Sequence, residues 1–180
     1  MKRKSYCLYL TLWLLMLAGP ALAQEPTPAL TARNTFFAEL YGNGGQYSLN
    51  FDRVFFQSGR FKSSLRVGAS IRPARVNLAG DRFVVGTLPL ELNGLWGGGS
   101  HHLEMGLGFT PGYHGRATHI DSRSFHAYSA RLGYRYQKPG GGLFFRAGLT
   151  PSLRSIKYPN LERKYHLNWA HGGIGLGWSF

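Results

Sequence analysis

The sequence predicts an all-β protein: an eight-stranded antiparallel up-and-down transmembrane β-barrel with a plugged polar interior. Three observations lead to this prediction. The chain of 180 residues contains eight runs in which apolar and polar residues alternate, as they do along a half-buried strand. Its 25 glycines, 14% aromatic residues and only 16% charged residues favour strands and tight turns over amphipathic helices. It ends on GIGLGWSF, whose large side chains all fall on one face of a strand.

The N-terminal end of the chain has the pattern of a secretory signal peptide. A basic start is followed by an apolar run at 6–18, and Ala21-Leu22-Ala23 is a small-x-small cleavage site. A transmembrane anchor would need about 20 apolar residues, and Gly19-Pro20 ends this run well before that. The next stretch, QEPTPALTAR, has two prolines and no pattern, so we expect it to be loose. The predicted segments are a signal peptide at 1–23, a periplasmic leader at 24–33 and the barrel at 34–180.

Charge and cysteine content exclude several classes of partner. The net charge of +13, part of which leaves with Lys2, Arg3 and Lys4, often indicates nucleic-acid binding, but an exported protein rarely meets nucleic acid. The single cysteine, Cys7, lies in the signal peptide, so the mature chain has no disulfide and no cysteine metal site. The histidines lack cysteines or paired carboxylates at ligand spacing, so they indicate loop or girdle positions and neither a metal nor a cofactor. These histidines are His101, His102, His114, His119, His166 and His171.

The first four runs predict strands that each bury one face. Pro89 falls inside the fourth run and removes one donor from the ladder, so we expect a bulge or kink there. The runs and their apolar residues are 36–41 with Phe36, Ala38 and Leu40; 47–52 with Tyr47, Leu49 and Phe51; 65–72 with Leu65, Val67, Ala69 and Ile71; and 87–93 with Leu88, Leu90 and Leu92.

The last four runs repeat the pattern and bring the number of strands to eight. Eight strands are enough to close a small barrel and remove every sheet edge. The runs and their apolar residues are 103–110 with Leu103, Met105, Leu107 and Phe109; 128–136 with Tyr128, Ala130, Leu132, Tyr134 and Tyr136; 145–150 with Phe145, Ala147 and Leu149; and 173–180 with Ile174, Leu176, Trp178 and Phe180.

The connections alternate between short and long. Tight turns (QSGR, GGGSH, KPGG) follow the second, fourth and sixth strands, whereas longer polar segments at 73–82, 113–124 and 154–166 follow the third, fifth and seventh. Outer-membrane barrels have this arrangement, with the short turns facing the periplasm. The first connection, 42–45, breaks the rule because it is short on the outer side.

Alternation alone leaves open which face points outward. A secreted lipocalin-like carrier, one alternative, would keep its apolar face inside around a ligand. Most strand glycines share the polar face, where they would make room for long charged side chains, whereas on a solvated exterior they would only weaken the strands. Aromatic residues also lie at both ends of the apolar face, as they do in membrane barrels, where rings of aromatic residues called girdles flank the apolar band. The expected girdles hold Trp96, Tyr134, Tyr136, Trp178 and Phe180 at the periplasmic side, Tyr47, Phe109 and Tyr113 at the outer side, and Trp169 if a bulge lies near Gly172 and Gly173.

The polar face carries a nearly balanced set of charges. In a closed eight-stranded barrel the interior is just wide enough for side chains to fill. Unpaired buried charges would be too costly to keep, so we expect a salt-bridge plug and no water-filled channel. The expected interior network consists of Glu39, Asp52, Glu91, Glu104, Arg66, Arg131, Arg135 and Arg146, with Arg72 on the same face.

The signal peptide, the eight amphipathic runs and the terminal Trp178-Ser179-Phe180 resemble small eight-stranded outer-membrane barrels of the OmpA and OmpX type. Stretches such as LNFDRVF, LPLELNGLWG, LGYRYQ and LFFRAGLTPSL are similar to a broad set of Bacteroidota outer-membrane proteins. The resemblance covers 34–180 and implies an outer-membrane location in a Gram-negative bacterium, with a structural, envelope-integrity or surface-interaction role. It also implies that Ile174, Leu176, Trp178 and Phe180 form an assembly signal for the barrel-assembly machinery, which periplasmic chaperones would serve.

Two further partners or activities remain open from the sequence. Some barrels of this type are enzymes on lipid A, and Ser124 and His126 share a face, but no orienting acid follows by pattern and no catalytic residue is predicted. The outer connections also hold an excess of positive charge where lipopolysaccharide phosphates would lie, so contact with those phosphates and with outer-membrane lipids is a hypothesis. The cations are Arg75, Arg116, Arg123, Arg154, Lys157, Arg163 and Lys164.

Overall fold

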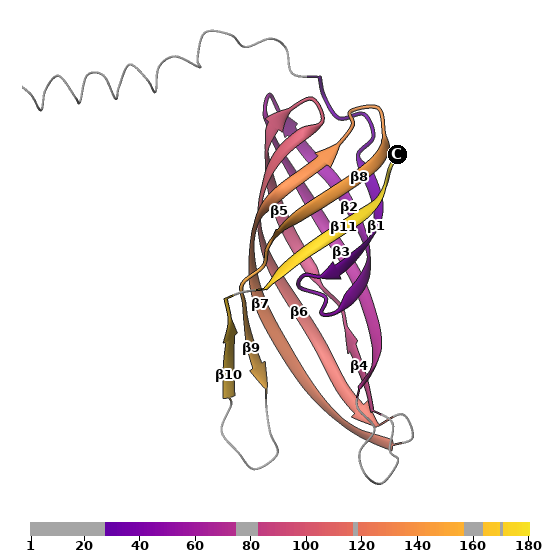
Figure 1. Cartoon of the computed structure of the whole chain (residues 1–180), viewed down its shortest axis with the longest axis vertical. Coiled ribbons are helices and arrows are strands. Elements are labelled where there is room, and N and C mark those ends of the chain that lie inside the picture. Colours follow the sequence, from indigo (N-terminus) through magenta and orange to yellow (C-terminus); the bar gives the residue numbers. More distant parts are fainter. Residues whose placement is uncertain (1–27, 75–82, 117–118, 157–163, 170) are drawn as a thin grey trace, which may run out of the picture.

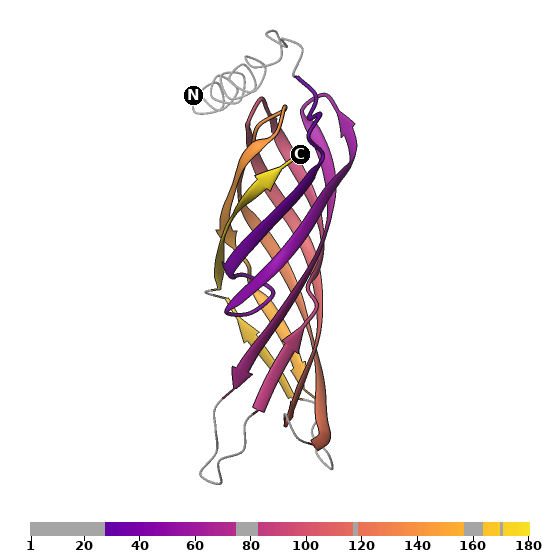
Figure 2. The ribbon, with the colours of Figure 1, turned by 90° about the vertical axis from the view of Figure 1, so that its right-hand side faces the viewer.

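A computed structural model describes residues 28–74, 83–116, 119–156, 164–169 and 171–180; the predicted signal peptide lies outside these residues. The described chain is all β, with antiparallel strands that run up and down (Figures 1 and 2). No helix in this part of the chain is long and apolar enough to cross a bilayer. The strands are β1 (Asn34–Tyr41), β2 (Tyr47–Ser58), β3 (Phe61–Ala74), β4 (Phe83–Thr87), β5 (Leu90–Gly98), β6 (His101–Arg116), β7 (His119–Gln137), β8 (Gly142–Leu149), β9 (Ser152–Ile156), β10 (Lys164–Asn168) and β11 (Gly172–Ser179).

The pairing of the strands returns to its starting point. Neighbouring strands pair in the order β1, β2, β3, β5, β6, β7, β8 and β11, and β11 pairs in turn with β1. The terminal GIGLGWSF supplies β11, with Leu176 opposite Ala38 of β1 and Phe145 of β8. The last strand of the chain therefore joins the two ends of the sheet.

One of the eight expected strands is interrupted, and beyond the expected seventh and eighth strands the structure has further strand segments after a break. Leu88 and Pro89 separate β4 from β5. Both pieces pair with β3 and β6 in the same register, so the ladder is interrupted at Pro89 but no residue is inserted, and the bulge considered there is not formed. Proline has no N–H for the ladder, but its carbonyl accepts a hydrogen bond of 2.8 Å from the Gly68 N–H. Pro151 lies between β8 and β9 in the same way. β10 ends at Asn168 and β11 begins at Gly172, so a break in the strand lies ahead of the glycines where a bulge was the condition for Trp169 to join the girdle, and Trp169 is exposed.

The strands extend further than alternation indicates. The expected loop at 113–124 is wrong for most of its length, because β6 continues to Arg116 and β7 begins at His119. Within 154–166, the described residues at both ends belong to β9 and β10, which pair with each other, and 157–163 lie outside the described residues. Ladder hydrogen bonds continue where both faces of a strand are polar, but the apolar periodicity that reveals a strand in a sequence does not. Among the described residues, β10 pairs on one side only, with β9.

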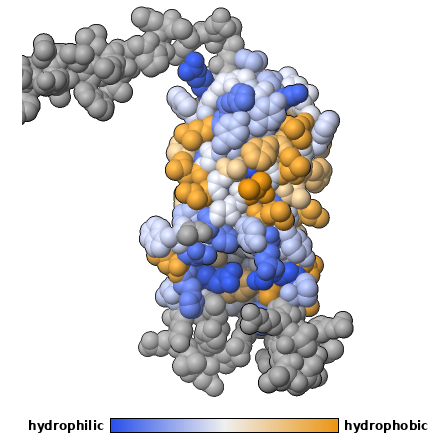
Figure 3. All heavy atoms as spheres, in the orientation of Figure 1, coloured by the Kyte–Doolittle hydropathy of each residue, from blue (hydrophilic) through white to orange (hydrophobic). Residues whose placement is uncertain are grey.

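The apolar face of the sheet points outward and the polar face points inward. Leu107 is 73% exposed and Leu49 is 70% exposed, whereas Arg66 is fully buried. On the face drawn in Figure 3, apolar side chains gather in a band across the half of the molecule next to the C-terminus, with polar residues below it. Tyr41 departs from its expected inward position because its φ of 59° is left-handed, and its side chain is exposed. The expected girdle residues Tyr47, Trp96, Phe109, Tyr113, Tyr134, Trp169, Trp178 and Phe180 are all exposed, and Tyr136 is half-buried.

Residues 28–33, the described segment before β1, close the end of the sheet that carries the tight turns. This part of the leader was expected to be loose, but Leu30 is buried with Val54 and Leu95 in an apolar cluster. Its backbone N–H donates to Gln57 Oε1 at 2.8 Å, and its carbonyl accepts from Gln57 Nε2 at 2.9 Å. Gln137 Nε2 donates to the Ala32 carbonyl from the other side of the sheet.

Leu30→Ala is expected to lower the free energy of unfolding by about 2–3 kcal/mol, the lower part of the range for leucine truncation at a buried site. The loss arises because the cluster with Val54 and Leu95 cannot collapse fully onto the smaller side chain. Urea unfolding of the refolded protein measures it. Pro28→Ala, at an exposed position of the same segment, is the control and should change the free energy by less than about 0.5 kcal/mol. Equal effects of the two changes would contradict the packing of this segment.

Candidate functional site

The interior of the sheet holds one network of four carboxylates and four guanidinium groups. Every side chain in it is buried, with at most 1% of its surface exposed. The structure thus brings together all eight residues predicted for the interior: Glu39, Asp52, Glu91, Glu104, Arg66, Arg131, Arg135 and Arg146.

The part of the network nearer the tight turns is built around Arg135. Its Nη1 and Nη2 donate to the two oxygens of Asp52 at 2.9 and 3.0 Å, which is the bidentate geometry that a guanidinium fork favours. Its Nε and Nη2 also reach Glu104 Oε1 at 3.0 and 2.6 Å. Ser64 donates a further hydrogen bond of 2.9 Å to Asp52. One arginine on β7 therefore links strands β2 and β6 across the interior.

The next part of the network is built around Glu39 and Glu91. Arg66 Nη2 lies 2.6 Å from Glu39 Oε2, and Arg131 Nη2 lies 2.7 Å from Glu39 Oε1. Arg131 Nε lies 3.0 Å from Glu91 Oε1, and Arg146 Nη2 lies 2.6 Å from the same oxygen. Each carboxylate is shared by arginines from different strands, so the cluster ties β1, β3, β5, β7 and β8 together.

Arg146 connects the two parts, because its Nε lies 3.2 Å from Glu104 Oε2. Two phenylalanines pack against the guanidinium groups. Phe37 lies under the guanidinium groups of Arg66 and Arg146, at 5.4 and 5.3 Å from ring centroid to Cζ. Phe144 packs against the Arg135 guanidinium group in the same way, at 5.3 Å, and the ring centroids of Phe37 and Phe144 are 5.0 Å apart. We expected charges on this face and gave no role to Phe37 and Phe144. Each lies two residues from a network residue, Glu39 or Arg146, so the alternation of the strand already placed both rings on the inner face.

The first turn of the sheet folds inward and covers this network. Asn43 Nδ2 donates to Glu91 Oε2 at 2.8 Å, so the tip of the turn is held by a network carboxylate. Thr87 donates to the Gly44 carbonyl at 2.7 Å, and Thr110 donates to the Asn43 carbonyl at 3.2 Å. Gly42 has a left-handed φ of 63°, and a side chain there would collide with the Glu39 carboxylate. The exceptional shortness of this connection is thereby explained: the turn is a floor inside the sheet.

Above this floor lies a cavity of about 380 Å³, here called the outer cavity. Its walls come from β4, β6, β7 and the β9–β10 hairpin, and its floor from the first turn. Arg72, expected within the network, is half-buried here instead, with its Nε beside Gly45. The lining residues are Gly42, Asn43, Gly44, Gly45, Thr87, Thr110, Phe125, Ala127, Ser129, Ser152, Arg154, His166, Asn168 and His171.

The pair considered for lipid A chemistry is not assembled into a triad. Ser124 is exposed, and His126 lies half-buried between the rings of Phe109 and Tyr128, at 6.3 and 5.8 Å. In the described part of the chain, His126 makes no hydrogen bond to a serine or a carboxylate. His102, expected in a turn or girdle, is buried inside the sheet opposite Arg135. No group of three or more histidine, cysteine or acidic side chains in this part of the chain is arranged to hold a metal ion.

The residues predicted as an assembly signal lie on the exterior of the last strand. Ile174, Leu176, Trp178 and Phe180 are exposed, while Gly173, Gly175 and Ser179 between them face inward. Among the basic residues of the outer connections, Arg75, Lys157 and Arg163 lie outside the described residues, and Arg154 lines the outer cavity. No protein-family model matches the chain, and no curated protein is significantly similar to it in sequence.

Proposed function

We propose that the protein is an integral outer-membrane β-barrel of a Gram-negative bacterium. Its eight strands close into a transmembrane barrel without an open pore, and its role is structural, in envelope integrity or in surface interactions. The observation that carries this proposal is the inverted polarity of the sheet, with charged residues inside and large apolar residues outside.

The exterior supports a lipid environment because its apolar side chains are contiguous and large. Leucines, phenylalanines and tryptophans from β1, β2, β3, β5, β6, β7, β8 and β11 are exposed side by side, as the band in Figure 3 illustrates. Soluble monomers rarely expose apolar patches of more than a few hundred Å², and larger ones mark contacts with a membrane or a protein. A lipocalin-like carrier would need the opposite arrangement, with its apolar side chains around an internal ligand.

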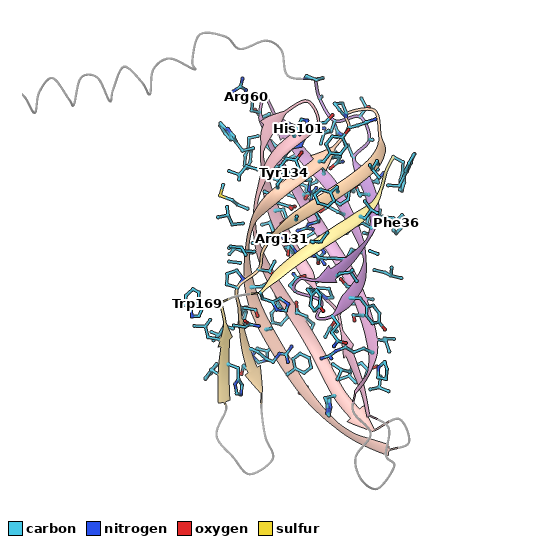
Figure 4. All side chains as sticks on the ribbon, viewed as in Figure 1. Phe36, Arg60, His101, Arg131, Tyr134 and Trp169 are labelled. Atoms are coloured by element: carbon cyan, nitrogen blue, oxygen red, sulfur yellow. The ribbon has the colours of Figure 1, made fainter. Side chains whose placement is uncertain are left out.

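The interior supports a plug. The four acids and four arginines fill the middle of the sheet, the first turn covers them on one side, and Leu30 with its cluster covers the other. Figure 4 shows Arg131 within the curled sheet, whereas Phe36 and Trp169 point away from it. A charge network with this many shared partners leaves no continuous aqueous path along the axis, so the barrel is closed to ions.

The last strand supports a route of assembly. β11 completes the cycle of strands and presents Ile174, Leu176, Trp178 and Phe180 on its outer face. In the proposed function, periplasmic chaperones deliver the chain and the barrel-assembly machinery recognises this strand. The partners of the folded protein are then the outer-membrane lipids and the phosphates of lipopolysaccharide.

Single cysteines at Leu65 and Leu107 test the orientation. Both positions are outward and exposed, and the chain outside the signal peptide has no other thiol. In whole outer membranes they should react with a bilayer-dissolved maleimide and resist a membrane-impermeant one. A cysteine at Arg60, in a turn, is the control and should react with the water-borne reagent. Preferential reaction of Leu65→Cys and Leu107→Cys with the water-borne probe would refute the membrane location, and steady conductance in planar bilayers would refute the plug.

A further inference from the structure

The outer cavity has the chemistry of a site for an anion that also carries hydroxyl groups. We propose that it binds a phosphorylated sugar, supplied either free in solution or as the headgroup of a lipid. The lipid source rests on the proposed membrane location, whereas the binding site itself does not.

The charge of the cavity favours an anion. Arg154 projects into it from β9 and stacks over the ring of Phe125, with 4.8 Å from the guanidinium carbon to the ring centroid. His166 and His171 also line the cavity, and none of its described lining residues is a carboxylate. Arginine presents a planar fork of donors that matches a phosphate, and stacking on an aromatic ring orients that fork before a ligand arrives.

The neutral lining favours hydroxyl groups. Ser129 Oγ and Asn43 Oδ1 are buried at the cavity and have no hydrogen-bond partner within the described residues. The two side chains meet over Gly108, where an added Cβ would lie 2.9 Å from Asn43 Nδ2. An unpaired buried acceptor or donor costs free energy. Both atoms are covered, so a sugar hydroxyl pairs with them after a small rotation of either side chain toward the cavity, and it can then both donate and accept. Ser152 and Asn168 extend the polar lining along the β9–β10 side.

The wall beside the cavity is not sealed by backbone hydrogen bonds. In the described chain, β10 has no strand partner opposite β9, and Ser70–Ala74 of β3 pair only with β4. Exposed Tyr41 and Trp169 lie at the ends of β1 and β10 on this side, at the edge of the apolar exterior. A headgroup carried by a lipid therefore reaches the same polar lining as a sugar phosphate from solution.

Calorimetry on the folded full-length mature chain in detergent micelles tests the site, with glucose 1-phosphate and glucose as probes. Glucose 1-phosphate should bind and glucose should bind at least tenfold more weakly. Arg154→Gln should weaken glucose 1-phosphate binding about tenfold or more, as expected for the loss of a charged hydrogen-bond donor. Ala127→Trp, which fills the cavity without changing its charge, should abolish binding.

Arg60→Gln is the matched control, since it removes the same charge from an exposed turn at the opposite end of the sheet (Figure 4). It should leave binding within about twofold. Each variant is first shown to be folded by circular dichroism. Absence of glucose 1-phosphate binding, equal binding of glucose, or equal effects of the two arginine changes would overturn the proposal.

A second arm distinguishes the two sources. The protein is placed in nanodiscs of phosphatidylethanolamine with or without lipid A, and glucose 1-phosphate binding is measured again. Competition by lipid A assigns the site to a lipid headgroup, whereas unchanged binding assigns it to a free sugar phosphate; both support the site. Because the micelle measurement does not depend on location in the membrane, its failure is separate from a failure of the cysteine labelling.

Discussion

Replacing Arg135 with methionine is expected to lower the free energy of unfolding by about 3–5 kcal/mol. Arg135 neutralises both Asp52 and Glu104, and all three side chains are fully buried. Methionine preserves much of the volume but leaves two carboxylates without their main cation, and a buried charge that loses its partner is strongly destabilising. Urea unfolding of the protein refolded into lipid vesicles, followed by tryptophan fluorescence, measures the loss.

The matched control for this change is Arg60→Met, which removes an exposed arginine and should alter stability by less than about 0.5 kcal/mol. A triple variant, Arg135→Met with Asp52→Asn and Glu104→Gln, removes the orphaned charges and should regain a large part of the loss. If Arg135→Met were as benign as Arg60→Met, the network would not stabilise the fold. If the triple variant were less stable than the single one, unpaired charge would not be the cause.

Leu107→Arg is expected to destabilise the membrane-embedded protein by about 2–4 kcal/mol, the cost of an arginine that faces lipid near the middle of the bilayer. Leu107 lies in the middle of β6, between Leu92 of β5 and Ala130 of β7, and is 73% exposed. The change adds no clash inside the sheet, because the side chain points outward. The unfolding free energy in vesicles, compared with that of the parent chain, reports the cost.

Depth provides the control for Leu107→Arg. Phe55 is also outward and exposed but lies close to the turn that ends β2, so Phe55→Arg should cost about 0–1 kcal/mol. Equal, small effects at both positions would indicate that water surrounds the exterior and would contradict the proposed membrane location. A large effect at Leu107 alone supports a band of lipid contact around the middle of the strands.

Much of the fold follows from side-chain parity in the sequence. Because successive residues of a strand face opposite sides, the positions of Arg66, Glu91 and Arg131 on one face are fixed once their runs are recognised. The interruption at Pro89 follows from the missing N–H of proline. The last strand is also readable, since alternation from Ile174 to Phe180 fixes which face each side chain occupies.

The partners within the network were not predictable in the same way. The sequence indicates that Arg135 and Asp52 share a face. The bidentate pair of hydrogen bonds between them depends on the tilt of their strands, and the two residues are 83 positions apart in the chain. The inward fold of the first turn is a similar case, because the hydrogen bond between Asn43 and Glu91 joins a turn to a distant strand. The burial of Leu30 was missed because a single large apolar residue that follows two prolines has no periodicity.

The extent of the strands was underestimated for a different reason. Apolar alternation indicates one buried or lipid-facing side, whereas the outer parts of β6 and β7 have mostly polar, aromatic or glycine residues on both sides, and β9 is only five residues long. The backbone ladder there is held by hydrogen bonds that every residue except proline can make, so composition carries little information about it. As a result, the hairpin of β9 and β10 and the cavity beside it emerged only in the structure.

The equal numbers of acids and arginines in the interior affect the electrostatic potential at the surface of the molecule. Because the internal charges cancel, the formal surplus resides on residues outside the network; it is +13 for the full sequence and 13 − 3 = +10 once Lys2, Arg3 and Lys4 leave with the predicted signal peptide. The positive electrostatic potential at the surface is therefore not offset by a buried negative charge. Anionic polymers should associate faster in dilute salt than in concentrated salt, because screening limits the range of the potential to about 10 Å at 0.1 M.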